Sequence, residues 1–250
     1  MEENAVNEKI EKQTKEASDI VMHKDVALQK LNTLMSTYIK NPNLISNADK
    51  LAYWLEDYCR FLNFEKNFKP CMLKTYKRGD IIKVNLGYNV GNEEGGLHYC
   101  VVIDKNNSKN SGIITVIPLT SDKGKPHHFS EVFLGNEIYT NFINKYSSIR
   151  LSLTSHINNI SKYRKEDTPS IEAVDEIIET LDLLKTWAKI ENEIAKMKSG
   201  SIALVSQITT ISKQRIYDPQ KTGDILSGLR ISDESLDLIN KKIKQLFIKD

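Results

Sequence analysis

The feature that most constrains the fold of this chain is a block of strand-like segments that a helical block divides in two. The strand-like runs are short and rich in β-branched residues, and they lie at residues 80–86, 98–104, 112–119, 127–134 and 201–211. Between the last two runs, residues 136–198 carry apolar side chains at helical spacing. This order of blocks predicts an α+β protein in which a helical insertion interrupts a small β-barrel.

Helices are also predicted before and after the strand-like blocks. A break at residues 41–43 separates two apolar patterns within residues 1–65, which predict a helical hairpin. In the insertion, Thr168 and Pro169 favour the start of a long helix. Its nearly heptad stripe is Val174, Ile178, Leu181, Leu184, Ala188, Glu191 and Ile194. A final helix is predicted after Ser232, with a buried stripe of Leu236, Ile239, Ile243 and Leu246.

The predicted domain organisation has three parts. Residues 1–72 form a helical extension, and residues 136–198 form the insertion, interpreted as a second helical hairpin. Residues 73–135 and 199–250 together form the barrel core with its C-terminal helix. Long insertions are tolerated where a fold has a loop rather than a hydrogen-bonded ladder, and the connection between the fourth and fifth strands is such a place.

Composition excludes several classes of protein. The chain has 35 basic and 33 acidic residues, and its net charge of +2 gives no global electrostatic case for nucleic-acid binding. The charged start lacks the apolar core of a secretory signal, and no apolar run reaches the roughly 20 residues of a membrane span. The three cysteines are odd in number and have no CxxC spacing. We expect a cytoplasmic protein with reduced thiols, no membrane contact, no metal and no cofactor.

Two separated motifs carry a family resemblance. The first is KRGDIIKVNL (77–86) followed by GNEEGGLHYCVVI (91–103), and the second is SIALVSQITTISKQRI (201–216), with VIPLTSDKG (116–124) between them. Together they resemble the MazF/PemK toxin family. The resemblance implies an SH3-like barrel of the CcdB/PemK type with a terminal helix, usually a homodimer, that cuts single-stranded RNA without metal. It also implies neutralisation by an antitoxin protein.

Cleaving RNA without metal needs a base for the 2′-hydroxyl proton, an acid for the departing 5′-oxygen and donors for the phosphorane. The resemblance implies that an arginine two positions beyond the paired glycines does much of this work, and that position is His98. Because an imidazole exchanges protons more readily than a guanidinium, His98 is the leading catalytic candidate. The resemblance also implies that Thr120 contacts phosphate, with Ser121 assisting. The alternative is that His98 is a strand histidine hydrogen-bonded to backbone and that the two hydroxyls only open a turn.

Substrate binding is predicted for a wider set of polar and glycine residues. These are Gly95, Gly96, Gln207, Thr209, Lys213, Arg215 and His128. Lys213 and Arg215 are the expected phosphate clamps, although a solvated strand end is the ordinary explanation of such residues. Glu93 and Glu94 are secondary candidates that orient His98 or act as a base, unless they are simply solvated loop carboxylates.

Two other functions compete with RNA cleavage. A non-catalytic module of the same barrel fold is one, because relatives of this barrel poison DNA gyrase by protein contact and the arginine is replaced at His98. A regulator that binds RNA without cutting it, in a phage or a phage-defence system, is the other. For the helical additions, dimerisation, covering of the RNA groove and docking of a larger partner remain open.

Overall fold

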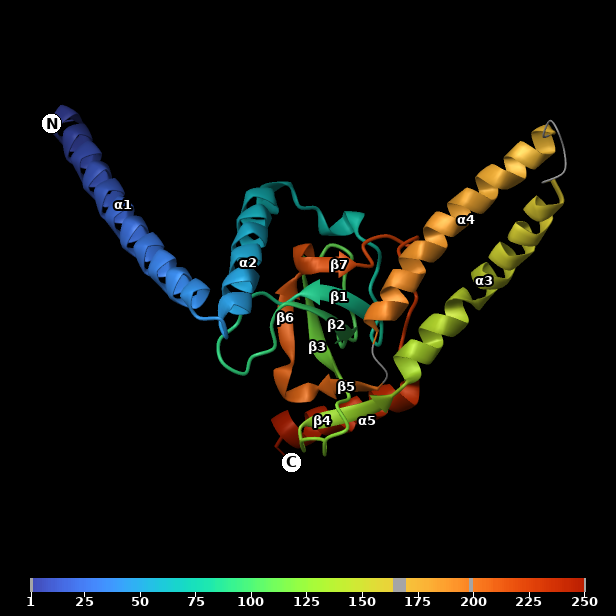
Figure 1. The fold of residues 1–250 in the computed structure, drawn as a ribbon. Helices are drawn as coiled ribbons and strands as arrows, with labels where there is room; N and C mark the ends of the chain where they lie inside the picture. Colours follow the sequence, from blue (N-terminus) through green and yellow to red (C-terminus); the bar gives the residue numbers. More distant parts are fainter. Residues whose placement is uncertain (1, 164–169, 198–199, 250) are drawn as a thin grey trace. The chain divides into compact units, whose positions relative to one another are not determined.

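The computed structural model of the protein describes residues 2–163, 170–197 and 200–249 (Figure 1). The chain divides into two compact units, residues 1–60 and residues 61–250. The first unit is helical. The second unit contains the sheet, the helices of the insertion and the C-terminal helix. The protein is therefore α+β, as the sequence predicts. Within the described residues, no helix has the length and apolar character that crossing a membrane requires.

Two consecutive helices form the N-terminal part of the chain. Helix α1 spans Glu2–Lys40 and α2 spans Ile45–Phe64. The predicted break between them is confirmed as a turn, in which the Leu44 amide donates to the Asn41 carbonyl at 2.9 Å. Ala48 and Leu51, which belong to the apolar pattern of the second helix, are buried. The two helices make few contacts with each other, so the expected hairpin is a pair of successive helices rather than a packed pair.

Seven antiparallel strands form the sheet. They are β1 (Ile81–Asn85), β2 (Leu97–Val102), β3 (Ile113–Ser121), β4 (Glu131–Gly135), β5 (Ser201–Leu204), β6 (Thr209–Ser212) and β7 (Ile216–Asp218). Their order is β4-β5-β3-β2-β1-β7, and β6 also pairs with β3. The long strand β3 is the centre of this arrangement, because β2 lies along one edge while β5 and β6 share the other.

The predicted strand at 201–211 is wrong in one respect, because it is two strands. A 3-10 turn, η3 (Val205–Gln207), separates β5 from β6. The break faces Pro118 of β3, which lies between the residues that pair with β6 and those that pair with β5. Proline has no N–H to donate, so a continuous ladder at this point of a central strand is disfavoured.

The predicted strand at 127–134 begins later than expected, at Glu131. The preceding residues bond locally instead of joining the sheet. The backbone N–H of His128 donates to the Glu131 carboxylate at 2.8 Å, and the His128 ring lies 2.8 Å from the Ser130 hydroxyl. Side-chain bonds of this kind offer the backbone an alternative to the ladder.

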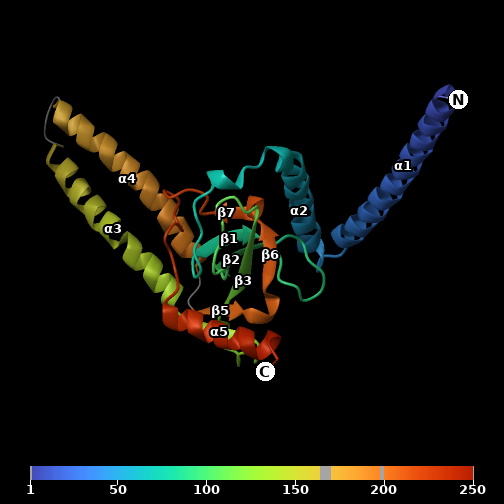
Figure 2. The ribbon, with the colours of Figure 1, turned by 180° about the vertical axis from the view of Figure 1, so that it is seen from behind.

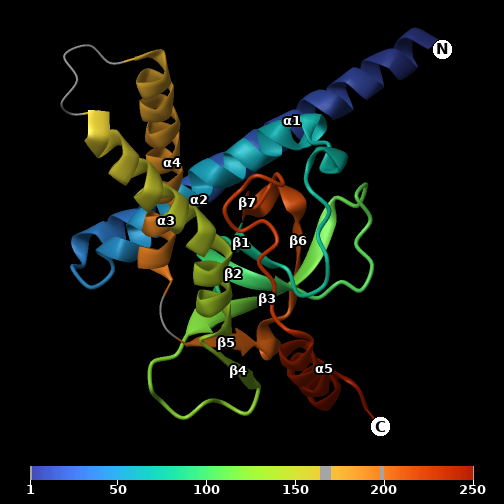
Figure 3. The same cartoon turned by 90° about the vertical axis from the view of Figure 1, so that its right-hand side faces the viewer.

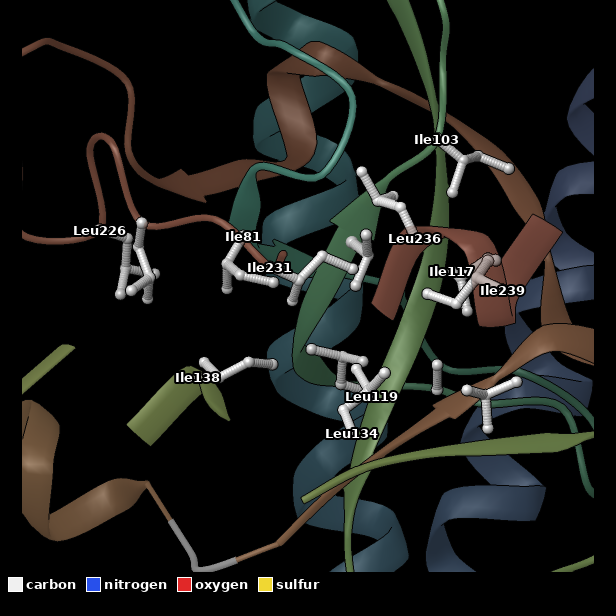
Figure 4. Packing of buried hydrophobic residues seen from close by; sticks show 14 of the residues in the cluster. Ile81, Ile103, Ile117, Leu119, Leu134, Ile138, Leu226, Ile231, Leu236 and Ile239 are labelled. Atoms are coloured by element: carbon white, nitrogen blue, oxygen red, sulfur yellow. The ribbon is translucent and has the colours of Figure 1, made fainter. Parts of the chain in front are cut away.

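Two apolar clusters occupy the two faces of the sheet. The inner cluster contains Ile82, Val84, Cys100, Val116 and Ile211, among others, from the strands that curl into the barrel. The outer cluster includes Leu236 and Ile239 of α5 (Asp233–Phe247), which pack against Ile117 of β3 (Figure 4). Ser232 caps α5 by accepting from the Ser235 amide at 3.2 Å, as predicted.

The insertion is a pair of helices, α3 (Glu137–Tyr163) and α4 (Ile171–Lys196), which lie side by side in Figure 1, Figure 2 and Figure 3. The Ser170 hydroxyl caps α4 by accepting from the Ala173 amide. The expected start at Thr168 and Pro169 lies outside the described residues.

The face of α4 that packs lies about one position away from the nearly heptad stripe. The buried face carries Ala173, Thr180, Ile190 and Glu193, whereas Val174, Ile178, Leu181 and Leu184 are exposed. Small side chains such as Ala173 and Thr180 let two helices approach closely, so the richest apolar stripe need not be the one that packs. An apolar stripe of α4 therefore faces solvent.

Candidate active site

The first sequence motif has a structural role at the entrance of β1. The Asp80 carboxylate is buried and accepts from Lys74 Nζ at 3.2 Å, from Arg230 Nε at 3.2 Å and from the Lys77 amide at 3.0 Å. A buried carboxylate held by two cations and a backbone donor is fully satisfied. The contacts of Asp80 therefore stabilise the fold at the start of β1. The candidate catalytic residues belong to the loop between β1 and β2 and to the strands beside it.

The paired glycines act through their backbone. A Cβ on Gly95 would lie 2.8 Å from the Gly87 carbonyl oxygen, and Gly96 has a φ of +83°. Both features require glycine, since a side chain would clash at the first position and be strained at the second. The Gly96 amide donates to the Gly87 carbonyl at 2.7 Å, which closes the loop between β1 and β2. The loop brings Glu94 beside His98.

Gln207 holds the same loop from the other side. Its amide oxygen accepts from the Glu94 N–H at 3.2 Å, and its amide nitrogen donates to the Asn92 carbonyl at 2.9 Å. The side chain expected to contact bases is thus engaged with the loop backbone. Its role in this structure is to position Glu94.

His98 lies on β2 with both ring nitrogens facing acceptors. Nδ1 lies 3.2 Å from the Leu119 carbonyl oxygen, and Nε2 lies 3.0 Å from Glu94 Oε1. A carbonyl oxygen can only accept, so Nδ1 carries a hydrogen, and a doubly protonated ring donates to both partners. The His98 side chain keeps 25% of its surface exposed, so substrate can reach it.

One cavity of about 440 Å³ brings the predicted catalytic residues together. His98, Thr120 and Ser121 line it, and Glu94 lies at its edge with them. Cys100 pairs with Pro118, so the alternation of side chains along β2 and β3 puts His98 and Thr120 on one face of the sheet, while Ser121 lines the cavity from the next position of β3. The arrangement offers an acid–base pair and two hydroxyl donors within a single cavity.

A second cavity of about 370 Å³ lies on the other side of Glu94. Gln207, Thr209 and Arg215 line it together with Glu93 and Glu94. Arg215 Nε donates to the Asn85 carbonyl at 2.7 Å, and burial lowers the pKa of its guanidinium from the ordinary value. Thr209 and Arg215 therefore line a common cavity, and their role in substrate binding stays a prediction.

Two of the predicted binding residues are elsewhere. Lys213 is only 2% exposed, its ammonium donates to the Ser108 carbonyl at 3.0 Å, and burial lowers its pKa. A buried ammonium with a backbone partner cannot clamp RNA, so the prediction for Lys213 is wrong. The exposed residue His128 is not among those that line either cavity, and its ring contacts that of Phe129 in a tilted arrangement, with the ring centroids 4.4 Å apart.

The sequence reasoning missed the residues that complete the first cavity. Lys123 belongs to the turn after β3, Tyr139 to the first turn of α3, and Lys196 to the end of α4. Nothing in the local sequence around Lys196 marks it, because it is nearly 100 positions from His98. Among the described residues, no group of three or more His, Cys, Asp or Glu side chains has the arrangement of a metal site.

Comparison with known proteins gives one family and one group of structures. Residues 77–184 match the family described as PemK-like, MazF-like toxin of type II toxin-antitoxin system. Solved structures similar to the chain include the crystal structure of MazF (Form-I) from Deinococcus radiodurans, with 13% identity and a TM-score of 0.36. That alignment covers 69% of this chain and 96% of the other. No curated protein matches the sequence.

Proposed function

We propose that this chain, in which residues 77–184 match the PemK-like, MazF-like toxin family, is an endoribonuclease. The substrate is single-stranded RNA, including mRNA, and the reaction is attack of the 2′-hydroxyl on the adjacent phosphate. The protein acts in the cytoplasm as the growth-arresting toxin of a toxin–antitoxin or phage-defence system.

The observation that carries this proposal is the pairing of Glu94 with His98 beside two hydroxyls in one cavity. RNA transesterification needs a proton acceptor and a proton donor, and both kinds of group are present 3.0 Å apart. The chemistry therefore requires only side chains that this cavity already contains.

The steps assign one role to each group. Glu94 takes the proton of the 2′-hydroxyl while the 2′-oxygen forms a bond to phosphorus. His98 gives its Nε2 proton to the 5′-oxygen as the P–O5′ bond breaks, and Thr120 and Ser121 donate to the non-bridging oxygens. The products are a 2′,3′-cyclic phosphate and a 5′-hydroxyl. The proton on Glu94 then passes to the adjacent Nε2 of His98, which restores the starting state.

The direct test is to incubate the full chain with single-stranded RNA in excess chelator. We expect cleavage products that end in a 2′,3′-cyclic phosphate, and no cleavage of DNA of the same sequence, because DNA lacks the 2′-hydroxyl. His98→Ala and Glu94→Gln each lower the rate about 100-fold or more, the usual effect of losing a general acid or base. His23→Ala, at an exposed histidine on α1, is the matched control.

Other outcomes identify other functions. Intact RNA that is nevertheless bound would mean that the barrel is a binding module. Intact RNA with inhibited gyrase would indicate a protein-directed poison. Either result would refute the assigned acid–base roles of Glu94 and His98, since both residues would then lack a reaction to catalyse.

A protein antitoxin is the second part of the proposal, and it follows from the type II toxin family. Expression of the chain alone should arrest growth, and co-expression of a small protein encoded next to it should restore growth. Cells that express the His98→Ala variant should grow normally without the small neighbouring protein. Growth arrest by His98→Ala as strong as that of the parent protein would separate toxicity from the proposed reaction.

We also propose that the protein is a homodimer that pairs α4 with α4 of a second copy. The stripe of Ile171, Val174, Ile178 and Leu181 is exposed on α4. The first half of the helix is acidic, whereas Lys185 and Lys189 lie in its second half. Antiparallel pairing centred on the exposed Leu181 and Leu184, near the middle of the helix, sets the acidic half of one copy against the half of the other that carries Lys185 and Lys189.

Oligomeric state measured by light scattering tests this pairing. Ile178→Glu puts a charge at the centre of the stripe and should convert dimer to monomer. Ile157→Glu makes the same change at an exposed position of α3 and should leave the dimer intact. A parent protein that is monomeric at high concentration, or a dimer that survives Ile178→Glu, would contradict the pairing.

A further inference from the structure

The two ends of the helical insertion, at Gly135 and Ser201, lie beside the proposed active site because of the sheet topology. Gly135, the last residue of β4, pairs with Ser201, the first residue of β5, and Ser201 in turn pairs with Ser121 of β3. The Gly200 amide donates to Asn136 Oδ1 at 2.7 Å, which ties the two ends of the insertion together. The chain therefore leaves and re-enters the sheet next to Ser121.

The insertion consequently forms one wall of the His98 cavity. Tyr139 comes from the first turn of α3, and Lys196 and Met197 come from the end of α4. The opposite wall is formed by β2 and β3, which carry His98 and Thr120. Residues of both the sheet and the insertion therefore surround the space next to His98.

A buried contact fixes the end of α4 on the barrel. Lys83 Nζ of β1 lies 2.6 Å from Glu193 Oε1, and the Tyr99 hydroxyl of β2 donates to the same carboxylate. Burial, and after it the Glu193 carboxylate, raises the pKa of Tyr99, so its hydroxyl remains a donor. Lys196 follows Glu193 by three residues, so this contact determines where Lys196 lies.

The cavity needs permanent positive charge that the catalytic pair does not supply. A protonated His98 beside an ionised Glu94 has no net charge, whereas the phosphorane gains negative charge during the reaction. Among the described residues that line the cavity, Lys123 and Lys196 carry ammonium groups. Tyr139 adds an aromatic ring that is 37% exposed, and single-stranded bases stack on such rings.

We infer that the insertion supplies an RNA subsite in which Lys196 binds a backbone phosphate and Tyr139 stacks on a neighbouring base. This inference rests on the proposed function, since it takes single-stranded RNA as the ligand. It assigns the helices a direct part in substrate binding, in addition to any part in association.

Binding of a 2′-O-methyl RNA oligonucleotide, which cannot be cleaved by 2′-hydroxyl attack, tests the subsite. Affinity is measured over a range of salt concentrations for the full chain. Lys196→Met should weaken binding and lower the slope of log K against log salt by about 0.7, the value for one phosphate contact on a single strand. Tyr139→Leu should weaken binding about tenfold and leave that slope unchanged.

Matched controls separate the subsite from general charge and aromatic effects. Lys241→Met removes an exposed charge from α5 outside the cavity, and Tyr217→Leu removes an exposed ring from β7. Both should bind like the parent protein. Thermal melts of all four variants check that each is folded.

The outcomes distinguish the two proposals. If Lys196→Met and Tyr139→Leu bind like their controls, the subsite inference is overturned even when the parent protein cleaves RNA. If the parent binds the oligonucleotide through these residues and cuts no RNA, the inference stands and the proposed reaction fails. A parent protein that does not bind the oligonucleotide overturns the inference as well.

Discussion

The contact between Glu193 and Lys83 allows a quantitative prediction. Glu193→Gln keeps the size of the side chain and removes its charge, which leaves the Lys83 ammonium buried without its closest counter-charge. Removing one partner of a buried ion pair costs about 3–5 kcal/mol. Asp218 pairs in register with Lys83 on β7 and supplies a second carboxylate nearby, so we expect the lower end of that range, about 3 kcal/mol.

The assay is thermal and urea unfolding of the full chain, monitored through a signal that comes from the second unit. For a unit of the length of residues 61–250, about 3 kcal/mol corresponds to a Tm lower by about 6–12 °C. Glu191→Gln, at an exposed position two residues away, should change stability by less than about 0.5 kcal/mol. Equal stability of the two variants would refute the claim that Glu193 anchors α4.

The double variant Lys83→Met/Glu193→Leu separates charge from packing. Replacing both members of a buried pair with apolar side chains is often neutral or stabilising, so most of the lost stability should return. A double variant as unstable as Glu193→Gln would mean that the shape of the contact, and not the unpaired ammonium, determines its contribution.

Three further variants test individual residues. Gly95→Ala should lower the rate of RNA cleavage at least about tenfold with little change in Tm, because the added Cβ would displace the loop that holds Glu94. Unchanged activity would contradict the role of this loop in positioning Glu94. Thr120→Val removes a donor to the phosphorane and should lower kcat about 10–100-fold with KM nearly unchanged; an effect on KM alone would indicate ground-state binding instead. Lys213→Met should reduce unfolding free energy by about 1–3 kcal/mol and leave the salt dependence of RNA binding unaltered; a lower salt slope would restore Lys213 as a phosphate contact.

The parts of the fold that the sequence predicts are those set by local pattern. Helix α5 has its cap at Ser232 and its buried side chains at Leu236 and Ile239, because capping and helical spacing involve residues close in sequence. The strands β1 and β2 were predicted for the same reason, since an apolar alternation flanks a glycine loop. Local chemistry is sufficient wherever the partner lies within a turn or a hairpin.

The parts that the sequence did not predict depend on a distant partner. The break between β5 and β6 depends on Pro118, which belongs to another strand. The packed face of α4 depends on α3, and it uses Ala173 and Thr180 while Ile178 stays exposed. Lys213 has the composition of a surface residue, yet the approach of Ser108 and Tyr76 buries its ammonium. Neither spacing nor residue type reveals such contacts.

The same distinction between local and distant partners applies to the residues of the candidate site. Glu94 and His98 are four residues apart, so one loop and one strand are enough to place them together. Thr120 and Ser121 join them through the pairing of neighbouring strands, which the motifs indicated. Tyr139 and Lys196 reach the cavity only because β4 pairs with β5, and that pairing is not visible in either segment alone.

This topology has a consequence for how the reaction and substrate choice are separated in the molecule. Glu94, one member of the proposed acid–base pair, lies in a tight glycine loop, where a methyl group added at Gly95 would meet the backbone, so the loop tolerates little change. The insertion starts and ends at Gly135 and Ser201, where the sheet already has a connection, so its length and side chains can vary without disturbing the loop. Because the two ends of the insertion lie beside Ser121, any such variation alters the wall of the proposed RNA site. Changes in the insertion should therefore alter which RNA is bound while the same pair of side chains moves the protons.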